Sequence, residues 1–156
     1  MQSKLITTFT AALVLATTAA GATAAGARAG DRAASAAQAG AKLAVKSSRY
    51  GKVLFDGRGY ALYLFGADRG TRSACYGACA KAWPPFLTSG KPVAGPGVQA
   101  RLLGTTLRRD GRLQVTYAGH PLYFYEGDGK GQIKCQNVSN FGGLWLVVAP
   151  NGKAVR

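Results

Sequence analysis

Apolar runs separated by glycine-rich turns follow one another from about residue 50 onward and predict a mainly β domain. Two β-favouring runs flank the turn at 56–59, and runs 112–117 and 120–125 flank a shorter turn, so the pattern predicts two hairpins. A third apolar run at 144–148, bounded by glycine-containing stretches, predicts a closing strand.

The two hairpins are copies of one unit. GYALYLFGAD, which begins at Gly59, returns as GHPLYFYEGD at Gly119, an offset of 60 residues. A single hairpin cannot bury its apolar face, whereas two that share a core can. We therefore expect two degenerate repeats, at about 51–86 and 111–149, around one core.

Leucine and tyrosine alternate in the second strand of each hairpin, so they lie on opposite faces of the pleat. We expect the leucine face to form the core and the tyrosine face to be more solvated. The expected core residues are Leu62 and Leu122, with Trp83 and Trp145 packed around them.

The segment SACYGACAKAWPP, residues 73–85, interrupts the strand pattern and predicts a short helix or a loop that carries Cys75 and Cys79. On a helix their Cβ atoms would be about 5–6 Å apart, and a disulfide needs about 3.5–4.5 Å. A helix would therefore exclude a bond between them, whereas a loop around Gly77 would permit one.

The third cysteine, Cys135, follows Cys75 by the same 60-residue offset. If an approximate two-fold axis relates the repeats, equivalent positions near that axis meet, and an exported chain would oxidise such a pair. We expect a Cys75–Cys135 disulfide, with Cys79 as a free thiol or the alternative partner.

The N-terminal part of the chain has the composition of an export signal and a spacer. Residues 1–24 combine one lysine, a short apolar stretch and small residues, as in a secretory signal peptide. Residues 25–48 are rich in Ala and Gly and predict a flexible tether. The folded two-repeat domain is expected at 49–156, in a protein secreted to the bacterial cell exterior and not stably inserted in a membrane.

The chain carries 20 Lys and Arg against 6 Asp and Glu. For a secreted protein such an excess favours acidic envelope polymers, or another envelope protein, as partners. The cations do not cluster, because only Arg108 and Arg109 are adjacent, and a solvated, soluble surface explains this scatter more simply than a binding patch. No motif of a nucleic-acid-binding module is present, so we expect no nucleic-acid partner.

Candidate catalytic residues are few. The only histidine, His120, stands at a hairpin turn where the first repeat has Tyr60, which favours a structural role. Asp68 and Asp128 each precede a glycine-containing turn, where a carboxylate caps free backbone N–H groups. We expect no enzymatic activity and no cofactor.

A metal site is the main functional alternative. Three thiols and one imidazole would suit zinc or copper(I) in a thiol or metal redox protein, with the ligands Cys75, Cys79, Cys135 and His120. Their spacing matches no common zinc pattern, and an oxidising compartment favours disulfides. We therefore predict no metal site.

The motif Y-x-(F/W/Y)-x-x-D occurs once in each repeat, at Tyr63, Phe65 and Asp68 and at Tyr123, Tyr125 and Asp128. With CYGACAKAWPP and FGGLWLVVAPNG, it makes residues 50–153 resemble the bacterial secreted-repeat family described as predicted lipoproteins with this motif. The resemblance implies export and no established activity. The chain lacks the cysteine of a lipoprotein signal, and Cys135 replaces a more usual glycine-rich stretch. Taken together, these features of the sequence predict a secreted, non-enzymatic protein that acts by surface binding or as a structural component.

Overall fold

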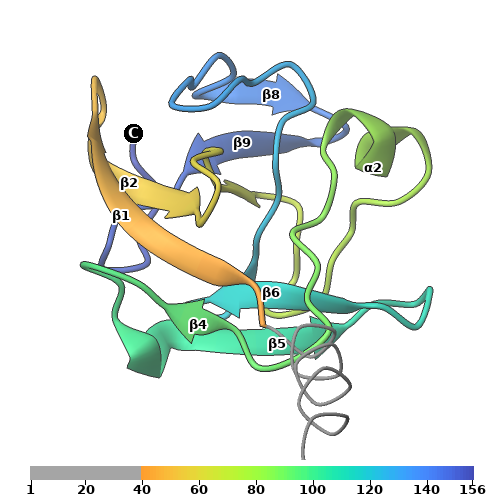
Figure 1. The fold of residues 1–156 in the computed structure, drawn as a ribbon. Coiled ribbons are helices and arrows are strands. Elements are labelled where there is room, and N and C mark those ends of the chain that lie inside the picture. The colour runs from red at the N-terminus through yellow and green to blue at the C-terminus, as the bar shows by residue number, and fades with distance from the viewer. Residues whose placement is uncertain (1–39) are drawn as a thin grey trace, which may run out of the picture.

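A computed structural model describes residues 40–156, which form three small sheets, one short helix and one 3-10 turn (Figure 1). The protein is mainly β, as predicted, with a two-repeat organisation. The elements are β1 Lys42–Ser48, β2 Gly51–Asp56, β3 Tyr63–Phe65, α2 Ala78–Ala82, β4 Val93–Ala94, η1 Ala100–Leu102, β5 Leu103–Leu107, β6 Leu113–Tyr117, β7 His120–Pro121, β8 Val138–Asn140 and β9 Gly143–Val147.

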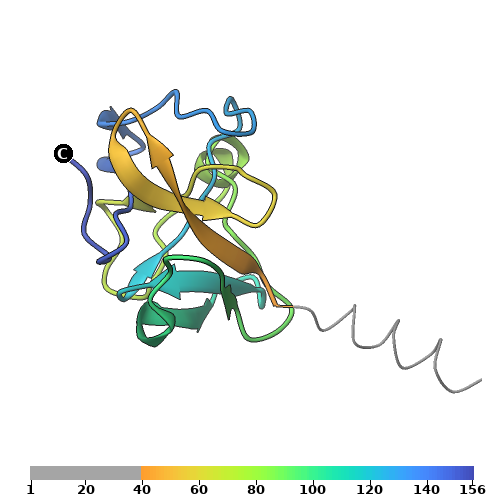
Figure 2. The same cartoon turned by 60° about the vertical axis from the view of Figure 1, so that its left-hand side comes forward.

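The first sheet has the strand order β2-β1-β4, and β1 and β2 form an antiparallel hairpin closed by the pair Ser48 and Gly51. This hairpin lies across the front of the molecule in Figure 2. The tether predicted for residues 25–48 therefore overlaps β1. Leu43 and Val45 recur at the spacing of a strand, and Leu43 is fully buried. The signal peptide predicted at 1–24 and the tether up to residue 39 lie outside the described residues.

Both predicted hairpin turns are present. After β2, Asp56 N–H donates to the Tyr60 carbonyl at 2.8 Å, which closes the turn at 56–59. In the third sheet, with the order β5-β6-β7, Tyr117 pairs with His120 across the second turn. Ala118 and Gly119 in that turn have φ values of 49° and 82°.

The repeats exchange their last strands. β3 of the first repeat pairs with β9 of the second, so that Tyr63 faces Val147 in the sheet ordered β3-β9-β8. In the second repeat, Phe124 N–H donates to the carbonyl of Pro84, which belongs to the tail of the first repeat. The motif strand of each repeat is therefore paired with the tail of the other repeat.

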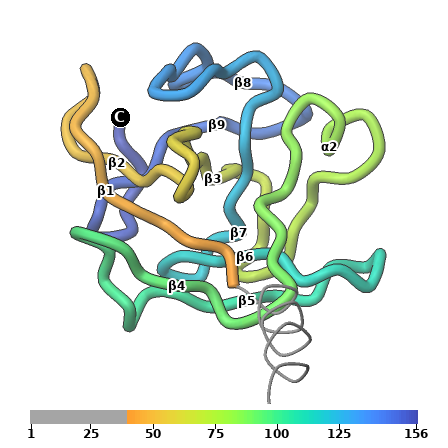
Figure 3. Tube along the Cα trace, viewed as in Figure 1, coloured from red at the N-terminus to blue at the C-terminus, as the bar shows by residue number. Residues whose placement is uncertain are grey.

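The motif tyrosines meet at the centre of this exchange. Tyr63 and Tyr123 each donate a backbone N–H to the carbonyl of the other, at 2.9 Å in both directions. Figure 3 shows β3 and the strand β7, which precedes Tyr123, near the middle of the trace. The reciprocal pair marks an approximate two-fold relation between the repeats.

Both faces of these central strands are buried. Leu62 and Leu122 are fully buried in one hydrophobic cluster, as predicted. The tyrosine face was predicted to be solvated, and that prediction is wrong, because Tyr63 and Tyr123 are also fully buried, in a second cluster. Trp83 and Trp145 belong to this tyrosine cluster and not to the leucine cluster. Strand exchange covers the second face, which alternation within one strand cannot reveal.

Candidate functional site

The motif tyrosine of each repeat binds the motif aspartate of the other. Tyr63 Oη donates to Asp128 Oδ2 at 2.6 Å, and Tyr123 Oη donates to Asp68 Oδ2 at 2.9 Å. These side-chain bonds follow the same exchange as the backbone. The Y-x-(F/W/Y)-x-x-D motif therefore joins the two repeats to each other.

The second oxygen of each aspartate caps the loop that follows it. Asp68 Oδ1 accepts the N–H of Ala74 at 2.8 Å, and Asp128 Oδ1 accepts the N–H of Lys134 at 2.9 Å. The predicted capping role of both aspartates is confirmed, and the six-residue spacing is the same in each repeat. Each carboxylate thus orders a loop and holds a tyrosine.

Burial dominates the titration of these groups. It raises the pKa of Asp68 from 3.8 to about 6, against the opposing effects of the Ala74 and Tyr123 hydrogen bonds and the Arg108 charge. Burial likewise raises the pKa of Asp128, and it raises the pKa of both Tyr63 and Tyr123 above the ordinary value of 10.0. The phenols therefore stay protonated at neutral pH and act as hydrogen-bond donors.

A buried arginine supports the Asp68 side of this arrangement. The guanidinium of Arg108 donates to Ser73 Oγ at 2.9 Å, to Gln114 Oε1 at 2.6 Å and to the Cys75 carbonyl at 2.7 Å. Ser73 Oγ in turn lies 2.8 Å from Tyr123 Oη. Sequence reasoning missed this role, because Arg108 beside Arg109 has the pattern of a solvated surface pair.

The third motif position builds an aromatic column through the core. Phe65 stacks on Trp145 with centroids 4.0 Å apart, Trp145 stacks on Trp83 at 4.0 Å, and Tyr125 lies tilted on Trp83 at 4.8 Å. The column runs from one repeat to the other. The hydrogen bonding of the two indoles differs: Trp145 N–H donates to the Asn140 carbonyl at 3.2 Å, whereas among the described residues the buried Trp83 N–H has no partner.

The disulfide joins Cys75 to Cys79, and Cys135 is free and partly buried. The predicted Cys75–Cys135 bridge is therefore wrong, as is the assignment of Cys79 as the free thiol. Helix α2 begins only at Ala78, so Cys75 lies outside it, and Gly77 with a φ of 57° turns the chain between the two thiols. The Cα atoms are 5.2 Å apart, within the usual range for a disulfide.

The four side chains of the metal alternative are not gathered at one place. Cys75 and Cys79 are bonded to each other, and His120 is an exposed residue of β7 at the second turn. Across residues 40–156, no group of three or more His, Cys, Asp or Glu side chains could hold a metal ion. The cysteines therefore offer a disulfide and one thiol rather than a ligand set.

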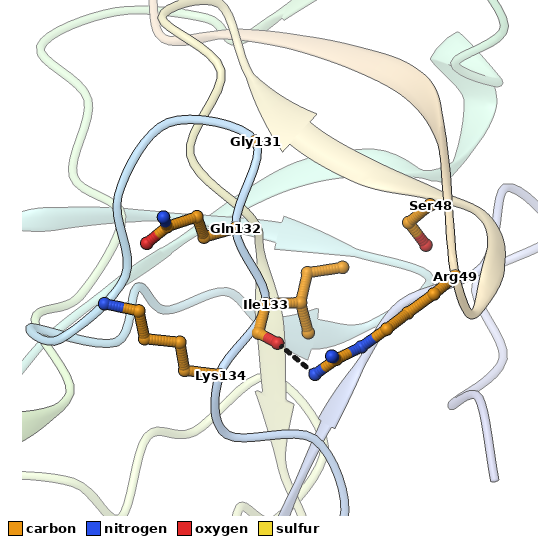
Figure 4. A pocket seen from close by; sticks show the side chains of 6 residues that line it. All are labelled: Ser48, Arg49, Gly131, Gln132, Ile133 and Lys134. Atoms are coloured by element: carbon orange, nitrogen blue, oxygen red, sulfur yellow. Dashed lines mark hydrogen bonds between the residues drawn. The ribbon is translucent and has the colours of Figure 1, made fainter.

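The surface hollows found in residues 40–156 are shallow. One of about 410 Å³ lies between the turn of the β1–β2 hairpin and the loop after Asp128 (Figure 4). There Arg49 crosses to donate to the Ile133 carbonyl at 2.8 Å, beside Gln132 and Lys134. This bond fixes the hairpin to the loop, so Arg49 is partly committed to the fold.

The exposed charges are almost all positive. Every lysine and arginine in residues 40–156 is exposed except Arg108, and the exposed carboxylates in that range are Asp110 and Glu126. Asp110 forms ion pairs with Arg112 at 2.7 Å and with Arg108 at 3.4 Å. Asp56, Asp68 and Asp128 are engaged in capping or hydrogen bonds within the fold. Most of the carboxylates in residues 40–156 thus form hydrogen bonds within the fold, whereas nearly all the cations are exposed.

A family model described as a secreted repeat of unknown function matches the chain twice, at residues 44–86 and 104–149. Each match begins in the strand before the predicted repeat, in β1 and in β5, which agrees with the strand pairing. No curated protein and no solved structure is significantly similar to the chain. Within the described part of the chain, no helix is long and apolar enough to cross a membrane. The chain therefore belongs to the family of secreted repeats of unknown function.

Proposed function

We propose that the protein is a non-enzymatic component of the bacterial cell exterior that associates with acidic envelope polymers through its exposed cations. The observation that carries this proposal is the division of charge in residues 40–156: every Lys and Arg except Arg108 is exposed, whereas only Asp110 and Glu126 among the carboxylates are exposed. A secreted protein with such a surface meets polyanions before any other partner of opposite charge.

The cations are spread over several elements rather than gathered in one deep site. Lys46 and Lys52 line a shallow hollow of about 370 Å³ on the β1–β2 hairpin, and Arg49 stands at the turn of the same hairpin. Such an arrangement suits a flexible polymer, which gains many weak contacts, better than a small anion. Acid–base catalysis has less support, because the motif carboxylates and phenols already bind one another in the interior.

The test is retention of the purified protein on cell-wall material over a salt gradient. Since the Debye length falls from about 10 Å at 0.1 M salt to about 3 Å at 1 M, the protein is expected to elute within this range. The variant Lys46→Gln/Arg49→Gln/Lys52→Gln should elute at lower salt, and Ser47→Ala on the same hairpin should not change elution. Retention that does not change with salt concentration, or no retention at all, would refute the proposal.

A further inference from the structure

A small aromatic pocket lies on the surface over the second repeat. It has a volume of about 200 Å³ and is lined by Arg58, Tyr60, Pro84, Phe124, Tyr125, Glu126 and the motif aspartate Asp128, which is bound to Tyr63. Three aromatic side chains and three charged ones thus converge on a space smaller than the about 300–1,000 Å³ of sites for drug-sized ligands. Its size suits a single ring.

Within residues 40–156, the two repeats differ at this place. At the equivalent positions of the first repeat stand Leu64 and Phe65, which pair with β9 and are buried, whereas Phe124 and Tyr125 are partly exposed. The chain that pairs with the second repeat here is Pro84-Pro85, and proline has no N–H to extend a sheet. Phe124 and Glu126 donate their N–H groups to the carbonyls of Pro84 and Ala82, but Pro84 and Pro85 have no N–H to donate in return, and the side chains of Phe124 and Tyr125 are partly exposed beside them.

The aromatic rings are held in place from below. Phe124 packs edge-on against buried Phe86 with centroids 5.1 Å apart, and Tyr125 packs on buried Trp83 at 4.8 Å. Tyr60 meets Phe124 edge-on at 6.4 Å. Because the rings are fixed before any ligand arrives, binding costs little ordering of side chains.

Of the charged side chains in the pocket, Arg58 and Glu126 supply both kinds of hydrogen-bonding group. The Arg58 guanidinium lies 5.4 Å from the Tyr60 centroid and 5.5 Å from the Phe124 centroid, and Asp56 holds it at 2.7 Å. Glu126, opposite in charge, is an exposed carboxylate that forms no ion pair with any described residue. A donor and an acceptor beside flat apolar rings match a ligand that has hydroxyl groups around an apolar face.

We propose that this pocket binds one neutral pyranose ring of an envelope glycan, with the ring against Tyr60 and Tyr125 and neighbouring hydroxyls on Glu126 and Arg58. The proposal rests on the proposed function, since acidic groups elsewhere on the same polymer would meet the surrounding cations. The negative Glu126 excludes a sugar carboxylate from the pocket itself. The pocket recognises the neutral sugar ring, and the surrounding cations attract the acidic polymer from a distance.

The test is NMR titration of the full exported chain with three probes: maltotriose and N,N′,N″-triacetylchitotriose, which are neutral, and trigalacturonate, which carries a carboxylate on every ring. At least one neutral probe is expected to shift the signals of Tyr60, Phe124 and Tyr125 saturably. Trigalacturonate should shift signals near lysines and arginines and leave the signals of the pocket residues unchanged. Glu126→Gln should weaken binding of the neutral sugar and allow the acidic sugar to bind in the pocket.

The matched variants are Tyr60→Ala and Tyr50→Ala. Each tyrosine is partly buried and has an arginine guanidinium over its ring, at 5.4 Å for Tyr60 and 4.8 Å for Tyr50, but only Tyr60 lines the pocket. Tyr60→Ala should weaken neutral-sugar binding about tenfold, as for an aromatic residue central to a binding site. Tyr50→Ala should leave it within about twofold.

Two results would overturn the proposal: no neutral probe moves the pocket signals, or trigalacturonate occupies the pocket in preference. If neutral sugars fail while salt-sensitive retention on cell wall persists, only the pocket proposal falls. If sugars bind the pocket and retention is absent, the polyanion proposal falls instead.

Discussion

Removing one phenol oxygen tests the central claim that the motif joins the two repeats. Tyr63→Phe keeps the ring in its buried cluster and so opens no cavity, but it takes the donor from Asp128 Oδ2. A hydrogen bond to a charged group contributes about 1.5–3 kcal/mol. Because Asp128 keeps the Lys134 N–H on its other oxygen, we expect a loss of this size in the free energy of unfolding rather than complete unfolding.

The pH dependence of this loss separates the hydrogen bond from a packing defect. The Tyr63 bond lowers the pKa of Asp128 against the rise caused by burial, so its removal raises that pKa further. A protonated carboxyl gains less stabilisation from the Tyr63 hydrogen bond than a charged carboxylate does. The destabilisation by Tyr63→Phe should therefore be smaller near pH 4 than at pH 7, whereas a packing defect would cost the same at both.

Denaturant titration of the full chain measures both quantities, with Tyr60→Phe as the control for loss of a phenol oxygen on a partly exposed ring. The control should change stability by less than about 0.5 kcal/mol, as is usual for surface substitutions. If Tyr63→Phe is as harmless as Tyr60→Phe, or if its cost does not vary with pH, the motif does not hold the repeats together in the way described.

Other consequences are equally direct. Since burial raises the pKa of Asp68 from 3.8 to about 6, the native protein binds that proton more tightly than the unfolded chain, so stability should fall as pH rises from about 4 to about 6. Asp68→Asn should reduce that slope in denaturant titrations. Cys75→Ser should cost about 2 kcal/mol, as expected for opening so short a disulfide loop, and peptide mapping without reduction should find Cys135 alkylated. Leu122→Ala should cost about 2–5 kcal/mol in the same titrations, as for other buried leucines.

The features that the sequence predicted correctly are local ones. The turn after Asp56 and the turn at Ala118-Gly119 follow from residues that tolerate tight turns, and both are present. The capping roles of Asp68 and Asp128 follow in the same way from the loops that begin directly after them. The 60-residue offset carried the repeat organisation, because equivalent sequences adopt equivalent local structure.

The features that the sequence did not predict depend on contacts between distant segments. Alternation placed leucine and tyrosine on opposite faces but could not show that β9 and its neighbours bury the tyrosine face as well. The disulfide depended on where the helix begins within residues 73–85, and a start at Ala78 leaves Cys75 outside the helical spacing. Burial of Arg108 depends on Ser73 and Gln114, which no local pattern connects to it.

The exchange of strands also explains why the two repeats differ at the surface, although the same Tyr–Asp hydrogen bonds are present at the centre of both. The tail of each repeat covers the motif strand of the other, so a change in one tail alters what the other repeat exposes. In the first repeat the alanine-rich segment 78–82 forms α2 and ends at Pro84-Pro85, whereas the equivalent segment of the second repeat, with Val138, forms strand β8. β8 supplies the Asn140 carbonyl that binds Trp145, and the first tail offers no such partner to Trp83. The Tyr–Asp pairs thus keep the core two-fold, and the proline-ended tail leaves the aromatic pocket open on one side only.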